Sequence, residues 1–325
     1  MTTSVWPPLP AHELKAAEDE SIARELSWLL DSLQETLTNL KSGLEECYAL
    51  LAPIEPGSTL VLSSPRSESI KGHVTRVGSR IVKGEDSQTL HLKLKTHAPL
   101  VLSLSPTDPL VLAPLSSLRT LLNQALDCVD ITRWTGDRHS APFISSQLLL
   151  LHGIIVEALS VLKGNTMHTH HGSANSSSST SSSTVQKSEG GLGLGANGGR
   201  DEWTLDPPSP TCFTPALPST LGLTLTLCDS SLLLTVRVLE PTSTQPNTFT
   251  RFATLTGMSR RLEHDEMDQT FTYRGEEVRV REKVRVESSA DPSLLSVGAK
   301  LGQIERVLES CRGGLAVVMG KPEED

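Results

Sequence analysis

A ladder of leucine residues near the N-terminus is the feature that most constrains how this chain folds. It comprises two interleaved series whose members lie seven residues apart: Leu26, Leu33, Leu40 and Cys47, and Leu30, Leu37, Leu44 and Leu51. Alternating steps of four and three residues place all of them on one face of an α-helix. We predict a helix from about Ala11 to Leu51 that ends before Pro53, because proline lacks the N–H that a continuing helix needs.

The apolar face of this helix needs a partner, which is either a second copy of the chain or the chain's own helices. Trp28 and Leu29 widen the stripe beyond the narrow seam of a two-stranded coiled coil. The ladder is also short for an independent zipper. We therefore predict an intramolecular bundle, with a homodimer formed through the ladder as the alternative.

The composition of the chain argues against some functional classes. The 325 residues carry a net charge of −9, and only 3% of them are aromatic. Because no cluster of Lys and Arg is available to neutralise phosphates, we expect no nucleic-acid partner. The low aromatic content argues against an active site lined by aromatic side chains. The five cysteines include no C-x-x-C pair, which predicts free thiols in a reducing compartment.

The chain shows neither a secretory signal nor an obvious membrane span. Its N-terminus has no basic region followed by a long apolar stretch. The most apolar run, Leu148–Leu162, is shorter than the about 20 residues that a membrane helix needs, and it contains His152 and Glu157. We expect a soluble, cytoplasmic protein.

The hydrophobic period divides the chain into blocks of strands and helices. Helical spacing is predicted from about Leu110 to Ile131, from Phe143 to Leu162, and after Asp291–Pro292, which is a favourable N-cap and N1 pair. The second of these helices is apolar nearly all round, which predicts a central place in the bundle. Gly313–Gly314 should end or break the last helix. Strands are predicted at 58–64, 69–78, 89–95, 222–229, 231–240, 269–275 and 276–288.

Two of these strand predictions carry further expectations. The strands at 222–229 and 231–240 should form a hairpin around Asp229–Ser230. In the strand at 276–288, valines alternate with charged residues, which predicts one face on the core and one in solvent.

Segregated blocks of helices and strands predict an α+β fold, because a doubly wound fold would alternate them. The helical bundle is expected to be discontinuous in sequence, and so is a β domain beside it. A Ser- and Gly-rich loop with little to bury is expected to be disordered. The predicted bundle comprises residues 11–53, 110–163 and 291–312, the β domain 57–103 and 213–288, and the loop 164–208.

Short motifs in the chain offer little chemistry. Gly193–Gly198 matches G-x-G-x-x-G, but it lies in the low-complexity loop and not between a strand and a helix, so we reject a dinucleotide site. Gly314–Pro322 resembles a phosphate-binding loop only loosely, since its spacing is wrong and Pro322 stands where Ser or Thr is required. A glycosylation sequon at Asn175 is irrelevant to a cytoplasmic chain.

Two clusters of titratable residues remain to be interpreted. His168, His170 and His171 lie at the start of the loop, where we expect adventitious metal binding and no built site. The carboxylates of Glu263–Asp268 are interpreted as a solvated loop, because no nucleophile or base accompanies them. The residues therefore predict no catalytic, cofactor-binding or metal-binding site.

Three stretches of the chain resemble the Rogdi leucine-zipper family. The first is ELSWLL at Glu25–Leu30, where the ladder begins, and the second is IKGHVTRVG at Ile70–Gly78. The most specific is Cys212–Pro241, in which Phe213 precedes Pro-Ala-Leu-Pro and a hairpin whose second strand is Leu232–Leu239. The stretches occur in the family's order, and the resemblance covers most of the chain outside the loop.

This resemblance implies a function that the residues alone do not. Proteins of this family are non-catalytic subunits of the RAVE complex, which regulates the vacuolar and endosomal proton ATPase. With a large WD-repeat scaffold protein, they promote reassembly of the V1 sector onto the V0 sector. The resemblance implies an elongated helical bundle beside a β domain, peripheral recruitment to vacuolar and endosomal membranes, and no catalytic residues or cofactors. The Ser/Gly-rich loop exceeds the family's shorter connection, and we interpret it as a fungal insertion.

An enzyme with a site between the α and β halves is the alternative from another functional class. A buried pair of titratable groups with perturbed pKa values in that region would favour it.

Overall fold

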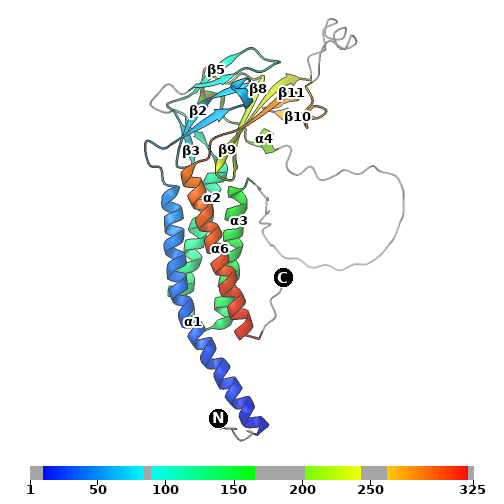
Figure 1. Cartoon of the computed structure of the whole chain (residues 1–325). Helices are drawn as coiled ribbons and strands as arrows, with labels where there is room; N and C mark the ends of the chain where they lie inside the picture. The colour runs from blue at the N-terminus through cyan, green and yellow to red at the C-terminus, as the bar shows by residue number, and fades with distance from the viewer. Residues whose placement is uncertain (1–9, 84–88, 165–201, 243–261, 321–325) are drawn as a thin grey trace, which may run out of the picture.

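The computed structural model describes residues 10–83, 89–164, 202–242 and 262–320, and it confirms the predicted α+β class. A helical bundle occupies one end of the elongated molecule, and two antiparallel sheets occupy the other (Figure 1). One continuous apolar core runs from the bundle into both sheets.

Four helices form the bundle, and each packs against two neighbours. They are α1 (Ala11–Leu50), α2 (Ala113–Asp130), α3 (Ala141–Leu162) and α6 (Pro292–Val318). Contacts join α1 to α2, α2 to α3, α3 to α6 and α6 back to α1, so the four helices close into a ring around the core.

The leucine ladder forms one wall of this core. On α1 its buried members are Leu30, Leu33, Leu37, Leu40, Leu44 and Cys47. Their burial within one chain confirms the predicted intramolecular bundle. It also argues against a homodimer formed through the ladder, because these side chains are buried and cannot contact a second chain. The helix ends at Leu50, just before Pro53, as predicted.

The ends of the helices follow the local chemistry of the sequence. Asp291 caps α6, and its carboxylate accepts hydrogen bonds from the backbone N–H groups of Ser293 and Leu294, as the N-cap prediction requires. Ser140 caps α3 by accepting from the N–H of Phe143. A π-helical turn, Ile131–Thr135, continues directly from α2 towards α3.

The larger sheet has seven strands, all paired antiparallel, in the order β6-β3-β2-β4-β5-β7, with β1 also paired to β2. The last strand enters it from far along the chain, after the predicted loop. The strands are β1 (Ser58–Ser63), β2 (Ile70–Val77), β3 (Arg80–Val82), β4 (Thr89–Leu92), β5 (Leu100–Leu104), β6 (Leu110–Val111) and β7 (Phe213–Thr214).

The smaller sheet has four strands in the order β10-β11-β9-β8. They are β8 (Leu221–Cys228), β9 (Ser231–Pro241), β10 (Thr270–Tyr273) and β11 (Glu276–Glu287). The turn between β8 and β9 is the predicted hairpin, with Asp229 at a φ of 53°, a left-handed conformation that Asp tolerates better than most residues.

Strand β11 differs from its prediction because a β-bulge divides it. The register against β9 shifts between Val280 and Glu282. Before the bulge, Val280 pairs with Leu239 in a small apolar cluster on the outer face of the sheet. After it, Val286 belongs to the main core. The predicted alternation is found, since Val278, Val280 and Val286 are buried and Arg279, Arg281, Arg285 and Glu287 are exposed. The extra residue nevertheless places the valines before and after the bulge on opposite faces of the sheet.

Two helix boundaries also differ from the sequence expectations. Leu110–Val111 forms strand β6, so the helix begins only at Ala113. Helix α6 continues through Gly313–Gly314 to Val318. Two helical glycines cost about 1 kcal/mol each, and full burial of Leu315 contributes about 1.5–3 kcal/mol. Burial therefore offsets most or all of the cost of the glycines.

The predicted disordered loop is too long at its C-terminal end. Residues 202–208 are described, and they include the short helix α4 (Glu202–Leu205), whose Trp203 is buried. Residues 165–201, with the histidines at 168, 170 and 171, Asn175 and the glycine motif at 193–198, lie outside the described residues.

Helix α3 needs a separate comment, because it is long and apolar enough to cross a membrane. A core helix of a soluble protein passes the same test, and α3 packs its inner face against α2 and α6. Its outer face is not covered, since Leu149 and Leu150 are 57% and 54% exposed. The expectation of a central position was thus wrong: α3 has two neighbours and one open apolar face.

Candidate functional site

A buried ion pair lies where the bundle meets the larger sheet. Nε of Arg76 on β2 lies 2.6 Å from Oδ2 of Asp291, and both side chains are buried. Each group has further partners, because Nη1 of Arg76 donates to the carbonyl of Gly78 and Oδ1 of Asp291 caps α6. This is the location at which a titratable pair would favour an enzyme. Here the hydrogen bonds of Arg76 and Asp291 connect strand β2 to the start of helix α6, so the pair links the two halves structurally.

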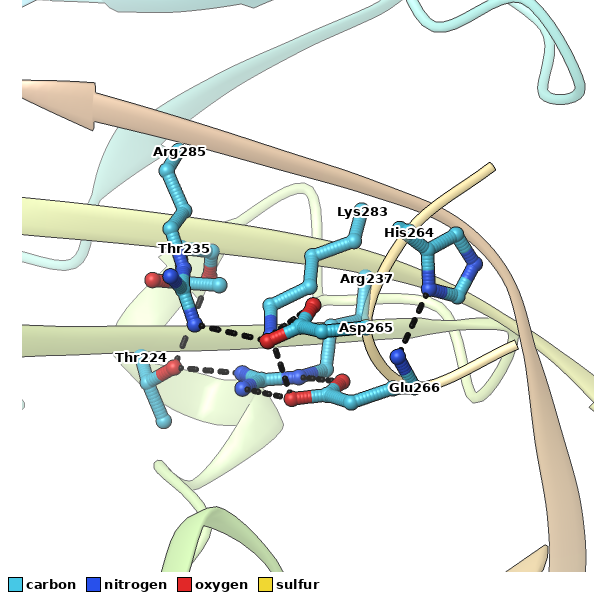
Figure 2. A network of polar contacts seen from close by, with 8 residues as sticks. All are labelled: Thr224, Thr235, Arg237, His264, Asp265, Glu266, Lys283 and Arg285. Atoms are coloured by element: carbon cyan, nitrogen blue, oxygen red, sulfur yellow. Dashed lines mark hydrogen bonds and ion pairs between the residues drawn. The ribbon is translucent and has the colours of Figure 1, made fainter. Parts of the chain in front are cut away.

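A second cluster of charges covers the outer face of the smaller sheet (Figure 2). Arg237 on β9 and Lys283 on β11 are directly opposite in the register. Glu266 lies across them and accepts from Nε and Nη2 of Arg237 at 2.8 and 3.0 Å, and from Nζ of Lys283 at 2.5 Å. All three side chains are buried, so one carboxylate lies between two desolvated cations.

Asp265 extends this cluster towards solvent. Its two carboxylate oxygens lie 2.8 and 2.9 Å from Nζ of Lys283, and Oδ2 lies 3.4 Å from Nη2 of Arg285. Nη1 of Arg237 donates to the hydroxyl of Thr224 at 3.0 Å. The donors of the two buried cations are thus satisfied within the sheet and the segment laid over it.

The neighbouring cations lower the pKa values of both carboxyl groups, Glu266 and Asp265. Burial alone would raise the pKa of Glu266, but the hydrogen bonds and charges of Arg237 and Lys283 outweigh it and hold the pKa below its ordinary value. The hydrogen bond from Lys283 likewise lowers the pKa of Asp265. Both groups are therefore ionised near neutral pH.

An aromatic cluster packs beside the charges. The guanidinium of Arg237 lies 4.5 Å from the ring centroid of Trp203, in a cation–π contact. The ring of Trp203 also packs in tilted geometry against Phe271 and Tyr273, with 5.3 Å between ring centroids in both pairs. Through this one side chain, α4 is anchored to the smaller sheet.

Glu282 links the two sheets through hydrogen bonds. The bulge in β11 turns its side chain inward, where the carboxylate accepts from the backbone N–H groups of Lys95 and Thr96 at 2.9 and 2.8 Å. The hydroxyl of Thr96 donates to it as well, at 2.8 Å. A buried carboxylate thus holds the segment after β4 against β11.

The structure corrects the interpretation of Glu263–Asp268. A solvated loop was expected, and Glu263 and Asp268 are indeed exposed, but Glu266 is almost fully buried. No group of three or more His, Cys, Asp or Glu in the described ranges could hold a metal ion. Gly314–Gly320, part of the rejected phosphate-loop match, belongs to the end of α6 and the turn after it.

Three members of these clusters were not predicted from the sequence: Arg237, Glu282 and Lys283. One signal was available in the strand at 276–288. Its valines follow one another at 278 and 280 and then at 284 and 286, and the interval of four is where the bulge and the two buried charges lie. The pairing of Glu266 with Arg237 had no local signal.

These observations define a class of elongated α+β protein in which a four-helix bundle and two antiparallel sheets share one core, and in which the buried charges bind one another. The chain belongs to the Rogdi leucine zipper family: the family model described as "Rogdi leucine zipper containing protein" matches residues 25–316. The predicted resemblance is confirmed over nearly the whole chain. A comparison with curated proteins finds no match.

Proposed function

We propose that this protein is a non-catalytic subunit of the RAVE complex and promotes assembly of the V1 sector onto the V0 sector of the vacuolar proton ATPase. The family match over residues 25–316 carries the proposal. The proposed partners are the large WD-repeat scaffold protein of that complex and, directly or through the scaffold, V1. The proposed location is the cytoplasm, with peripheral recruitment to vacuolar and endosomal membranes.

The distribution of charged and apolar groups supports a role in binding. The two clusters around Arg76–Asp291 and Arg237–Glu266 use their hydrogen bonds within the protein and so contribute to its rigidity. Exposed large apolar side chains occur on outer faces of the bundle, such as Trp28 on α1 and Leu149 on α3, and also on the β half, such as Val61 and Val101. Apolar surface of this kind suits protein–protein contacts.

The proposal is tested by purification of the tagged protein from cells at native expression, with mass spectrometry of the proteins that co-elute. We expect a large WD-repeat protein together with V1 subunits. Removal of the chain should lower the amount of V1 on membranes while total V1 stays constant. Elution of the chain alone or with unrelated metabolic enzymes, and unchanged V1 on membranes, would refute the proposal.

A further inference from the structure

The N-terminal part of α1 extends beyond the bundle. Every residue of Ala11–Glu25 is exposed, and Leu30 is the first buried residue of the helix. Figure 1 shows this part, here called the free segment, running past the ends of the other bundle helices. A helix of this length without tertiary packing is only marginally stable in water. Its helical form therefore gains from a partner.

The free segment presents apolar side chains at regular spacing. Leu14 and Ile22 are eight residues apart, hence on the same face, and they are 47% and 49% exposed. Ile22, Leu29, Thr36 and Gly43 follow one another at intervals of seven residues. One face of α1 thus continues from the free segment into the bundle.

The continuation of this face is a groove between α1 and α6. Two hollows of about 400 and 470 Å³ lie there, and both are lined by Thr36, Gln303 and Val307. The remaining lining is mixed: it includes the short Gly43 and Ser310, the apolar Leu40 and Ile304, and the charged Glu46, Lys300 and Arg306. Grooves between helices with such short side chains admit a further helix.

The edges of the groove stay open towards the free segment. Helices α1 and α6 run antiparallel, since Glu46 near the end of α1 pairs with Lys300 near the start of α6. Further along the groove, a Cβ at Gly314 would meet no atom within 4 Å. At the same end, Trp28 is 70% exposed. A helix in the groove would cover Trp28 and then continue over Ile22 and Leu14.

The free segment supplies the charge that specifies the partner. In the hollows Glu46 pairs with Lys300, and Arg306 adds a positive charge. Between Ala11 and Trp28 the sequence has five acidic residues and only two basic ones, Lys15 and Arg24. Glu18 and Glu25 are seven residues apart and border the apolar side chains of the groove-facing side. A second copy of this chain would bring carboxylates against carboxylates, and an anionic membrane would also be repelled. A helix with Lys and Arg beside its apolar stripe is complementary.

We propose that the α1–α6 groove and the free segment together bind one amphipathic, basic helix of a partner protein. Its apolar stripe fills the groove and covers Ile22, and its basic residues face Glu18 and Glu25. The inference rests on the proposed function only in requiring a protein partner. It does not depend on which protein that is.

The first test uses the full chain and two synthetic peptides of 28 residues. One peptide has leucines at heptad spacing flanked by lysines, and its matched control has glutamate in place of every lysine. Fluorescence anisotropy of the labelled peptides measures the affinity. We expect the basic peptide to bind at least about tenfold tighter than the acidic one. Equal affinities, or tighter binding of the acidic peptide, would overturn the proposal.

Variants locate the binding surface. Glu18→Lys combined with Glu25→Lys should weaken binding of the basic peptide by about tenfold, because attraction becomes repulsion. Glu13→Lys combined with Glu20→Lys makes the same change in net charge on the opposite side of the helix and should weaken binding by less than about threefold. An equal loss in both variants would show only non-specific attraction and would refute the site.

Hydrogen exchange and two further measurements separate other occupants. Bound basic peptide should slow amide exchange in Ala11–Glu25, and Leu14→Ser with Ile22→Ser should abolish that protection. A dimer that is lost on Ile22→Ser would show that a second copy occupies the surface. Ile22-dependent binding to phosphatidylserine vesicles would show that a membrane does. Either result overturns the proposal.

The outcome is separable from that of the proposed function. Peptide binding that persists, while V1 and the WD-repeat protein fail to co-purify, would refute the RAVE role and leave the helix-binding surface. The opposite outcome has two parts: the unaltered chain does not bind the peptide, and Glu18→Lys with Glu25→Lys leaves co-purification of V1 and the WD-repeat protein unchanged. That outcome would refute the helix-binding surface and leave the RAVE role.

Discussion

Removal of the Glu266 carboxylate provides a quantitative test of the buried charge cluster. Glu266→Gln keeps the size of the side chain but leaves Arg237 and Lys283 desolvated without a counter-charge, since their side chains are 7% and 3% exposed. Removing one partner of a buried ion pair costs about 3–5 kcal/mol. A protein of ordinary stability has about 5–15 kcal/mol in total. We therefore expect the loss of about a fifth or more of its stability.

Urea unfolding followed by tryptophan emission is the appropriate assay. Trp203 lies against Arg237 in the same cluster, whereas Trp28 and Trp134 are already exposed. In a Trp6→Phe background, which removes the fourth tryptophan, the change in emission on unfolding therefore reports the smaller sheet. The unfolding midpoint should fall with little change in the slope. Asp265→Asn is the matched control: it removes a carboxylate that is half exposed and should cost no more than about 1 kcal/mol.

Two results would refute this reasoning. The first is a cost of Glu266→Gln no larger than that of Asp265→Asn, because the burial of the pair would then have no energetic consequence. The second concerns the triple variant Glu266→Leu, Arg237→Met and Lys283→Met. It removes all three buried charges together and should recover most of the stability. If it were less stable than Glu266→Gln alone, unpaired charge would not be the cause of the loss.

Three further predictions concern the ladder, acid and a thiol. Leu37→Asp should prevent folding, as measured by circular dichroism, because it buries an unpaired charge. Leu14→Asp on the free segment is the control and should leave the fold intact. A folded Leu37→Asp variant would contradict the bundle. The pKa values of Glu266 and Asp265 are lowered in the folded protein from their ordinary values of 4.5 and 3.8. The stability that these carboxylates contribute is therefore present in full above their ordinary pKa values and is lost as the pH falls through the lower folded values. Melting temperatures measured between pH 6 and 3 should fall below about pH 4.5, and they should fall less in Glu266→Gln. Burial raises the pKa of Cys47 to about 11, so iodoacetamide at pH 8 should leave it unmodified until the protein is unfolded.

Local sequence patterns were enough to predict the features that form within one helix or one hairpin. The ladder on α1, the hairpin at Asp229–Ser230 and the Asp291 cap all follow from residues within a few positions of one another. Each expresses a geometric rule, the 3.6-residue turn, the two-residue loop or the N-cap, that tertiary structure did not override.

What the sequence could not supply depends on long-range pairing. Strand β7 joins the larger sheet beside β5, more than 100 residues earlier, and nothing in its two residues specifies that edge. Glu266 is acidic in an acidic segment, and only the register of β9 against β11 places two cations beneath it. The free segment was inside the predicted helix, but its lack of neighbours required the positions of the other helix ends.

The closing of the bundle by its last helix has a consequence for synthesis of the protein. The ion pair between Glu46 and Lys300 joins residues 254 positions apart. At about 5–20 residues per second, the ladder emerges on the order of tens of seconds before α6 can cover it. During that interval the leucines of the nascent chain are exposed to solvent, and exposed apolar surface of this kind is prone to aggregation. A stop codon anywhere between α3 and α6 should therefore yield an aggregating product and not a smaller folded one.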